Sequence, residues 1–146
     1  MHVPLTFATR VEEYHRAGYP LLWLQTHEEQ RALALFNAKE IFGDPLLSVW
    51  SLTQGWIKPE SYPYSLESSN SGLRDPLQAL AWISTVLVNP EAGAFFILKD
   101  FHPFLGNPQV IRALRDLLPH CKQQGKTLVI LSPVLKIPVE LEKDTV

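Results

Sequence analysis

Leu21-Leu22-Trp23-Leu24-Gln25-Thr26-His27-Glu28-Glu29 is the stretch that decides the fold of this chain. Its first four residues form an unbroken apolar run, which is typical of a strand with helices packed on both of its faces. Its last four residues have the pattern of a capping box, in which the Thr26 hydroxyl accepts from the N–H of the third helical residue and the Glu29 side chain reaches back. The stretch therefore predicts a strand that leads directly into a helix.

The same alternation of apolar runs and helical patterns continues on both sides of this stretch. Apolar spacing and stop signals predict four helices, at 5–17, from 27 to the stop at Gly43, from Asp75 to 88, and from Asn107 to Gly125. Further strands are predicted at 46–50, 94–98 and 128–131. Pro119 lies inside the fourth helix and predicts a kink or a break, because its ring removes a backbone bond.

Two of these helices have a clear start and a clear buried face. Asp75-Pro76 and Asn107-Pro108 both place a capping side chain before a proline in the first helical position. The third helix is expected to bury Leu77, Leu80, Ala81, Ser84, Leu87 and Val88. The fourth helix is expected to bury Val110, Ile111, Leu114, Leu117, Leu118 and Cys121.

Strict alternation of strands and helices indicates right-handed βαβ crossovers. The expected fold class is a single α/β domain over 1–146, a three-layer sandwich around a mostly parallel sheet of four to five strands. By analogy with the RecA-like and AAA-like sheets of P-loop ATPases, the expected strand order is first, fourth, third, second. Residues 52–74 show no period and are rich in Ser, Pro, Gly and Tyr, so a long and mobile loop is expected there.

Composition excludes several classes of protein. A net charge of -2 without any basic run argues against nucleic acid as a partner, and 46% hydrophobic residues argue against disorder. Cys121 is the only cysteine, which rules out an internal disulfide and a multi-cysteine metal site. Neither a signal peptide nor an apolar run of membrane-spanning length is present in the sequence, so a cytoplasmic protein is expected.

The chemistry of a P-loop ATPase is missing after the first strand. A phosphate loop, Gly-x-x-x-x-Gly-Lys-Ser/Thr, would use glycine N–H groups and a lysine to hold phosphates. The sequence has Thr26-His27-Glu28-Glu29-Gln30-Arg31 instead, and its carboxylates satisfy the positive end of the helix dipole themselves. No catalytic residue, bound cofactor or metal site is therefore expected in this chain.

Two strand ends nevertheless resemble parts of an ATPase. Lys99-Asp100 follows an apolar strand in the manner of a Walker B segment, in which the Asp holds magnesium, and Ser132 follows the last strand where AAA-type sheets carry a polar sensor. A turn or cap role is the more common one for such residues. An atypical nucleotide site at Lys99, Asp100 and Ser132, without a phosphate loop, remains an alternative.

Aromatic residues supply the candidates for contact with a partner. Trp50, Trp56, Tyr62 and Tyr64 flank or occupy the long loop, and Phe101-His102-Pro103-Phe104 follows the third strand. Such residues can anchor a partner, or they can fold the loop back over the edge of the sheet. Packing within a stiff loop is the more common role of a histidine such as His102.

The stretches Tyr19–Glu29, Val49–Ser51, Asp75–Leu80, Leu98–Leu105 and Lys126–Leu135 together carry a family likeness. The chain resembles the N-terminal region of the AAA-type ATPase of cyanobacteria and some algal plastids that is named after hypothetical chloroplast reading frame forty-six. The resemblance covers about 19–144. It implies a longer parent protein in which an AAA+ module with ATP and magnesium follows this region, and a location in the cyanobacterial cytosol or the plastid stroma.

The resemblance implies a non-catalytic regulatory or assembly domain, in a family that has been linked to the regulation of photosynthesis and inorganic-carbon use. Its expected partners are its own AAA+ module, other subunits of a possible hexamer, and a further protein. Besides the atypical nucleotide site, a receiver-like partner-binding module is a second alternative, although Glu28 and Glu29 fall on a helix and Lys136 is offset from the position that such a module requires.

Overall fold

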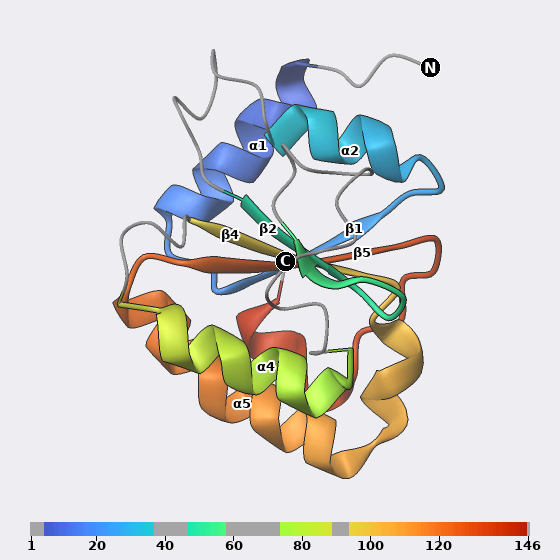
Figure 1. Ribbon diagram of the computed structural model, residues 1–146. Coiled ribbons are helices and arrows are strands. Elements are labelled where there is room, and N and C mark those ends of the chain that lie inside the picture. Colours follow the sequence, from blue (N-terminus) through green and yellow to red (C-terminus); the bar gives the residue numbers. More distant parts are fainter. Residues whose placement is uncertain (1–4, 37–46, 58–73, 89–93, 146) are drawn as a thin grey trace.

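A five-stranded sheet forms the centre of the molecule (Figure 1). The computed structural model describes residues 5–36, 47–57, 74–88 and 94–145. The strands are β1 (Leu21–Gln25), β2 (Leu47–Ser51), β3 (Gly55–Ile57), β4 (Phe95–Lys99) and β5 (Thr127–Ser132). Their order in the sheet is β1-β5-β4-β2-β3, and all neighbours are parallel except β2 and β3. The order expected for the four strands predicted from the sequence is therefore confirmed.

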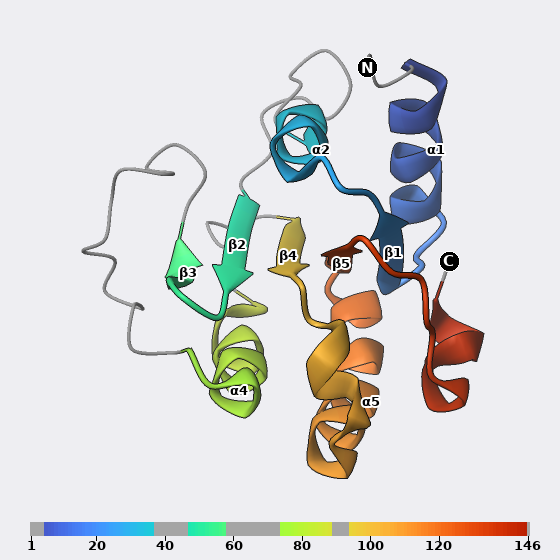
Figure 2. The same cartoon turned by 90° about the vertical axis from the view of Figure 1, so that its right-hand side faces the viewer.

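Helices cover both faces of the sheet, which confirms the three-layer α/β architecture (Figure 2). One face carries α1 (Leu5–Arg16) and α2 (Glu29–Phe36). The other face carries α4 (Pro76–Val86), α5 (Pro108–Gln123) and two short 3₁₀ helices, η3 (His102–Gly106) and η4 (Val139–Asp144). Among the described helices, none combines the length and apolarity that crossing a bilayer requires.

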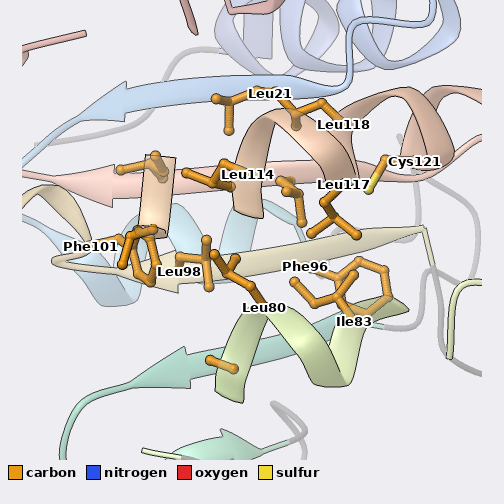
Figure 3. Close-up of a cluster of buried hydrophobic side chains, with 14 of the residues drawn as sticks. Leu21, Leu80, Ile83, Phe96, Leu98, Phe101, Leu114, Leu117, Leu118 and Cys121 are labelled. Carbon is orange, nitrogen blue, oxygen red and sulfur yellow. The ribbon is translucent and has the colours of Figure 1, made fainter. Parts of the chain in front are cut away.

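Two hydrophobic clusters account for the continuous apolar strands. Neighbouring residues of a strand point to opposite faces, so Phe96 and Leu98 of β4 pack under α4 and α5, whereas Phe95 and Ile97 join the cluster that includes Val11 of α1. Figure 3 shows the larger cluster, where side chains of α4 and α5 meet the strands. Because both faces are buried, every residue of β4 is apolar or shielded from solvent.

Helix α5 follows its sequence signals closely. Asn107 caps it by accepting from the N–H of Gln109 at 2.8 Å, and all six residues of the expected apolar face are buried. Gly125 then adopts a φ of +68°, as expected for a helix stop. The helix runs unbroken through Pro119, so of the kink or break expected there the break does not occur; Leu117, Leu118 and Cys121 anchor this part of the helix in the core.

Helix α4 begins as predicted and Leu80 and Leu87 are buried as expected, but the rest of its buried face differs. Asp75 accepts from the N–H groups of Leu77 and Gln78. The buried residues are Ala79, Leu80, Ile83 and Leu87. Ala81 and Ser84 are exposed, and Val88 is 75% exposed. This helix is apolar on more than one side, so its sequence is compatible with two rotational settings, and packing against β3, β4 and α5 selects one of them.

The expectation of a long loop over 52–74 was wrong at its start. Residues Gly55–Ile57 form β3, which turns back on β2 and pairs with it in antiparallel register. The turn uses Gly55 at a φ of +68°, and the N–H of Gln54 donates to the hydroxyl and to the carbonyl of Ser51. Residues 58–73 lie outside the described part of the chain. The carboxyl-terminal part of the second predicted helix, at 37–43, does so as well.

The sheet gains one more contact at its β1 edge. Thr145 forms an isolated parallel bridge with Leu21. Just before it, Leu141 of η4 is fully buried in the larger cluster beside α5. The end of the described chain therefore packs against the first strand.

Candidate functional site

The carboxyl ends of the four parallel strands meet at one edge of the sheet. Gln25 lies opposite Ser132, and Lys99 lies opposite Leu131, in the registers of β1 with β5 and of β4 with β5. Ligands of open α/β sheets bind beyond this edge. Two open cavities lie there, of about 680 Å³ and 510 Å³, which we call the α2 cavity and the turn cavity. Glu29 and Asp100 line both of them.

The α2 cavity surrounds the start of α2. It is lined by Thr26, His27, Glu28, Glu29, Gln30, Arg31, Asp100 and Pro133. Glu28 pairs with Arg31 across 3.4 Å, but both side chains are more than a third exposed, so this ion pair contributes little to stability. The cavity occupies the place where a phosphate loop would stand, and its walls carry more carboxylates than cations.

The capping box expected at Thr26 is only half present. The Thr26 hydroxyl accepts from the N–H of Glu28 at 3.0 Å, two residues along the chain, and α2 begins at Glu29. The N–H of Thr26 does not bond to the Glu29 carboxylate, as a complete box requires, because it donates to the carbonyl of Ser132 at 2.8 Å. The hydrogen bonding between β1 and β5 thus continues one residue past the strand and replaces the second half of the box.

Glu29 contacts a lysine of the neighbouring strand end instead. Its carboxylate lies 3.8 Å from the ammonium of Lys99, whose side chain is only 7% exposed. A buried ammonium requires such a partner, because loss of the Glu29 carboxylate would leave the buried charge of Lys99 uncompensated. The predicted topology places the ends of β1 and β4 at the same edge of the sheet, so Glu29 and Lys99 could have been expected to lie close together. The search for sequence motifs missed this ion pair.

Asp100 has an unusual backbone and a side chain open to solvent. It is the one non-glycine residue with positive φ, +50°, among the residues described. Its N–H donates to the carbonyl of Leu131 at 2.9 Å, so the chain turns sharply out of β4 while it remains tied to β5. Asp and Asn tolerate this left-handed conformation better than other side chains do. Asp100 lines both cavities.

Ser132 lies next to β1 but points inward. Its hydroxyl is buried, accepts from the indole N–H of Trp23 at 3.1 Å, and donates to the carbonyl of Val134. The same indole N–H donates to the Val134 carbonyl at 2.9 Å. These bonds hold the segment that follows β5 against β1. They also occupy the Ser132 hydroxyl, the group predicted to resemble a nucleotide sensor.

The aromatic candidates divide into a buried set and a rim set. Trp50, Trp56 and Phe101 are at most 1% exposed, which differs from the expectation that they could anchor a partner. The Trp56 indole N–H donates to the carbonyl of Ala79 at 3.1 Å, so β3 is fixed to α4. Phe104 is half-buried and lines the turn cavity. Tyr62 and Tyr64 lie outside the described residues.

His102 begins η3 and is half-buried. Its Nδ1 atom is buried and has no hydrogen-bond partner among the described residues. The ring lines neither of the two cavities. Nor does any group of three or more His, Cys, Asp or Glu residues with the geometry of a metal site occur in the described part of the chain.

Gly125-Lys126-Thr127 lies at the amino end of β5 and matches the last three residues of the phosphate-loop motif, Gly-Lys-Ser/Thr. This tripeptide precedes a strand instead of following one. The Thr127 hydroxyl is buried, lies 2.7 Å from Nδ1 of His15, and donates to the carbonyl of Tyr19. Burial, reinforced by the charge of Arg16, lowers the pKa of His15, so the ring is held neutral.

Comparison with known proteins places the chain beside the N-terminal parts of AAA proteins. Residues 7–146 match the family model described as "SpoVK-like AAA ATPase, N-terminal domain". The "Uncharacterized AAA domain-containing protein ycf46" of Guillardia theta is 33% identical over 128 residues, which cover 86% of this chain and 24% of that protein.

The proteins of the same name from Trieres chinensis and Pyropia yezoensis are 32% and 30% identical, over 87% and 86% of this chain, and again over 24% of their own lengths. The chain thus spans about a quarter of these relatives. No solved structure matches the chain.

Proposed function

The chain belongs to the family of SpoVK-like AAA ATPase N-terminal domains, and from this premise we propose that it serves its parent ATPase as a non-catalytic regulatory and assembly domain. In this proposal, ATP and magnesium are bound by the AAA+ module of the parent protein, and the present domain binds neither. Its partners are that module, neighbouring subunits of a ring such as a hexamer, and a further protein whose recruitment it controls.

The observation that carries the proposal is the start of α2. A triphosphate bound after β1 would meet the carboxylate of Glu28 just before the helix and that of Glu29 in its first turn, where a phosphate loop would supply backbone N–H groups. Lys99, at the end of β4, is engaged by Glu29. Nucleotide binding there would require breaking this ion pair and moving both carboxylates away.

The positions of Asp100 and Ser132 also support the proposal. A Walker B aspartate acts on magnesium that a bound nucleotide brings with it, and the present strand ends offer the carboxylate of Asp100 without a phosphate loop. The Ser132 hydroxyl is engaged by Trp23 and Val134. The strand order thus agrees with the one expected by analogy with AAA-type sheets, while the Ser132 hydroxyl serves internal contacts and the Asp100 carboxylate stands without a phosphate loop.

The cellular role proposed for the parent protein is regulation of photosynthesis or of inorganic-carbon use, in the cyanobacterial cytosol or the plastid stroma. The support is the family resemblance together with the similarity to proteins named ycf46. Removal of this domain alone from the parent gene of a cyanobacterium would then impair growth at limiting CO₂ and leave growth at high CO₂ unchanged.

The biochemical test compares the whole parent protein with a form that lacks the present domain. The account expects the shortened form to bind and hydrolyse ATP in its AAA+ module, with changed oligomeric mass in light scattering or lost response to its partner. Loss of all ATP binding from a shortened form with intact secondary structure would contradict a non-catalytic role.

The atypical nucleotide site is the alternative that one observation favours, because a cavity of about 680 Å³ lies where open α/β sheets bind their ligands. Substitution Asp100→Asn distinguishes the two functions. Magnesium-dependent ATP binding by the chain that disappears in this variant would support the alternative and contradict the assembly role as stated here.

A further inference from the structure

The turn cavity has walls that differ from those of the α2 cavity. It lies between the β2–β3 turn and η3, and its lining consists of Glu29, Ser51, Leu52, Thr53, Gln54, Lys99, Asp100, Pro103 and Phe104. Leu52 is 52% exposed at its rim. Leu52, Pro103 and Phe104 give the cavity an apolar wall, and the strand ends give it a charged one.

The charged wall is unbalanced. Of the three carboxylates at this edge of the sheet, Glu28 pairs with Arg31 and Glu29 pairs with Lys99. The carboxylate of Asp100 has no hydrogen bond or ion pair with another side chain of the described chain, although it lines both cavities. One uncompensated negative charge therefore remains at the rim, on a backbone that the bond from the Asp100 N–H to Leu131 ties to β5.

The apolar wall is fixed as well. The ring of Phe104 packs edge-on against Trp50 and Phe101, with ring centroids 6.0 Å and 5.6 Å apart. Both of these partners are fully buried. A ligand would therefore find a preformed surface that combines an aromatic ring, a proline and a free carboxylate, and it would lose little free energy in ordering that surface.

A guanidinium group on an aliphatic stem is complementary to both walls. Its charge and its forked N–H donors fit a carboxylate, its weak hydration suits a partly apolar cavity, and it stacks readily on aromatic rings. An anion would meet Asp100 and Glu29, and it could reach Lys99 only by displacing Glu29 from a side chain that is 7% exposed.

We propose that the turn cavity is the docking site for an arginine side chain that projects from the protein partner of this domain in the assembled ATPase. The inference rests on the proposed assembly function and gives it a location and a chemistry. Asp100 binds the guanidinium, and Leu52, Pro103 and Phe104 pack against the stem of the arginine.

The test titrates the ¹⁵N-labelled 146-residue chain with acetyl-Gly-Arg-Gly-amide and follows its backbone amide resonances. The account expects saturable shifts at Thr53, Gln54, Asp100 and Phe104, with far smaller shifts for the matched peptide in which neutral citrulline replaces arginine. Asp100→Asn, which keeps an αL-tolerant side chain of the same shape, is expected to weaken binding about threefold to fivefold. The control Glu140→Gln, at an exposed carboxylate on η4, is expected to leave binding unchanged.

Leu52→Ser provides a second variant that alters the apolar rim without touching a charge, and it too is expected to weaken binding. Equal shifts with the citrulline peptide, equal binding by Asp100→Asn and the parent chain, or stronger shifts with inorganic phosphate would each overturn the inference. A lysine peptide that binds as tightly as the arginine peptide would contradict the assignment to arginine. If the arginine peptide fails while the chain still associates with its AAA+ module, this inference falls and the assembly role stands.

Discussion

The backbone N–H of Asp100 donates to the carbonyl oxygen of Leu131 at 2.9 Å, while Asp100 itself adopts a φ of +50°. This bond ties the exit of β4 to β5 and sets the carboxylate at the rim between the two cavities. The backbone conformation restricts which residues can stand at this position, and the charge of the side chain decides what can bind there. The two requirements can be separated by substitution.

Replacing Asp100 by Gly removes the steric cost of a left-handed residue and should leave the free energy of unfolding within about 0.5 kcal/mol of the parent chain. Asp100→Val places a β-branched side chain at positive φ and should destabilise the fold by about 1–3 kcal/mol. Urea unfolding followed by circular dichroism measures both. Equal stability of the Gly and Val variants would contradict the backbone conformation described for Asp100.

Trp56 should act as a structural residue. Its ring is 1% exposed, stacks at 4.9 Å from Trp82, and donates to the carbonyl of Ala79. Trp56→Ala should therefore cost about 3–5 kcal/mol of unfolding free energy, because it leaves a cavity in the core and removes the hydrogen bond to Ala79.

Leu52→Ala is the matched control for Trp56→Ala, since Leu52 lies in the turn that leads into β3 but is 52% exposed, and it should cost less than about 0.5 kcal/mol. Urea midpoints compare the two variants. Similar losses at both positions would show that β3 is not fixed to α4 through Trp56.

Cys121 should be inert toward alkylating reagents in the folded chain. The thiol is fully buried on α5, and burial raises its pKa to about 12, with Lys126 acting weakly in the other direction. At pH 8 the thiolate fraction is therefore roughly a thousandfold below that of an ordinary thiol, before steric protection is counted.

Mass spectrometry after treatment with iodoacetamide measures the reactivity of Cys121. The folded chain should remain unmodified under conditions that label glutathione and the urea-unfolded chain completely. Labelling of the folded chain at the rate of glutathione would contradict the burial of Cys121.

His15 should make the stability of the chain depend on pH. Burial lowers its folded-state pKa below the ordinary value of 6.5, so at pH values between the two the unfolded chain binds more protons than the folded chain. The stabilisation from this residue is complete above pH 6.5 and decreases as pH falls toward the folded-state pKa.

Urea unfolding at pH 7.5 and pH 5.5 measures this effect. His15→Asn retains a polar atom near Thr127 and should reduce the loss of stability between the two pH values. His120→Asn, at an exposed position, serves as the control and should retain that loss. An undiminished loss in His15→Asn would assign the pH dependence to other groups.

The whole buried face of α5 was predicted from the sequence pattern itself, whereas the order of the parallel strands was expected only by analogy with AAA-type sheets. Alternating strands and helices restrict the connections to right-handed crossovers, and α5 has apolar residues on one side only. The face of α4 was not determined in this way, since Leu77 and Ala81 compete with Ala79 and Ile83, and contacts distant in sequence decide between them.

The site was predicted less completely than the fold. The strand ends that carry Glu29, Asp100 and Ser132 followed from the topology, whereas the bond from Thr26 to Ser132 and the ion pair of Glu29 with Lys99 depend on contacts between elements. The three-residue strand β3 gave no periodic signal in the sequence because it is shorter than one detectable repeat. Trp56 was therefore assigned to the loop and Trp50 to its flank, although both belong to the core.

Isothermal titration calorimetry of the chain with ATP and magnesium tests the central claim most directly. The account predicts no saturable heat at millimolar nucleotide, because the carboxylates of Glu28 and Glu29 occupy the start of α2 and Lys99 is engaged by Glu29. Saturable, magnesium-dependent binding that Asp100→Asn abolishes would contradict it.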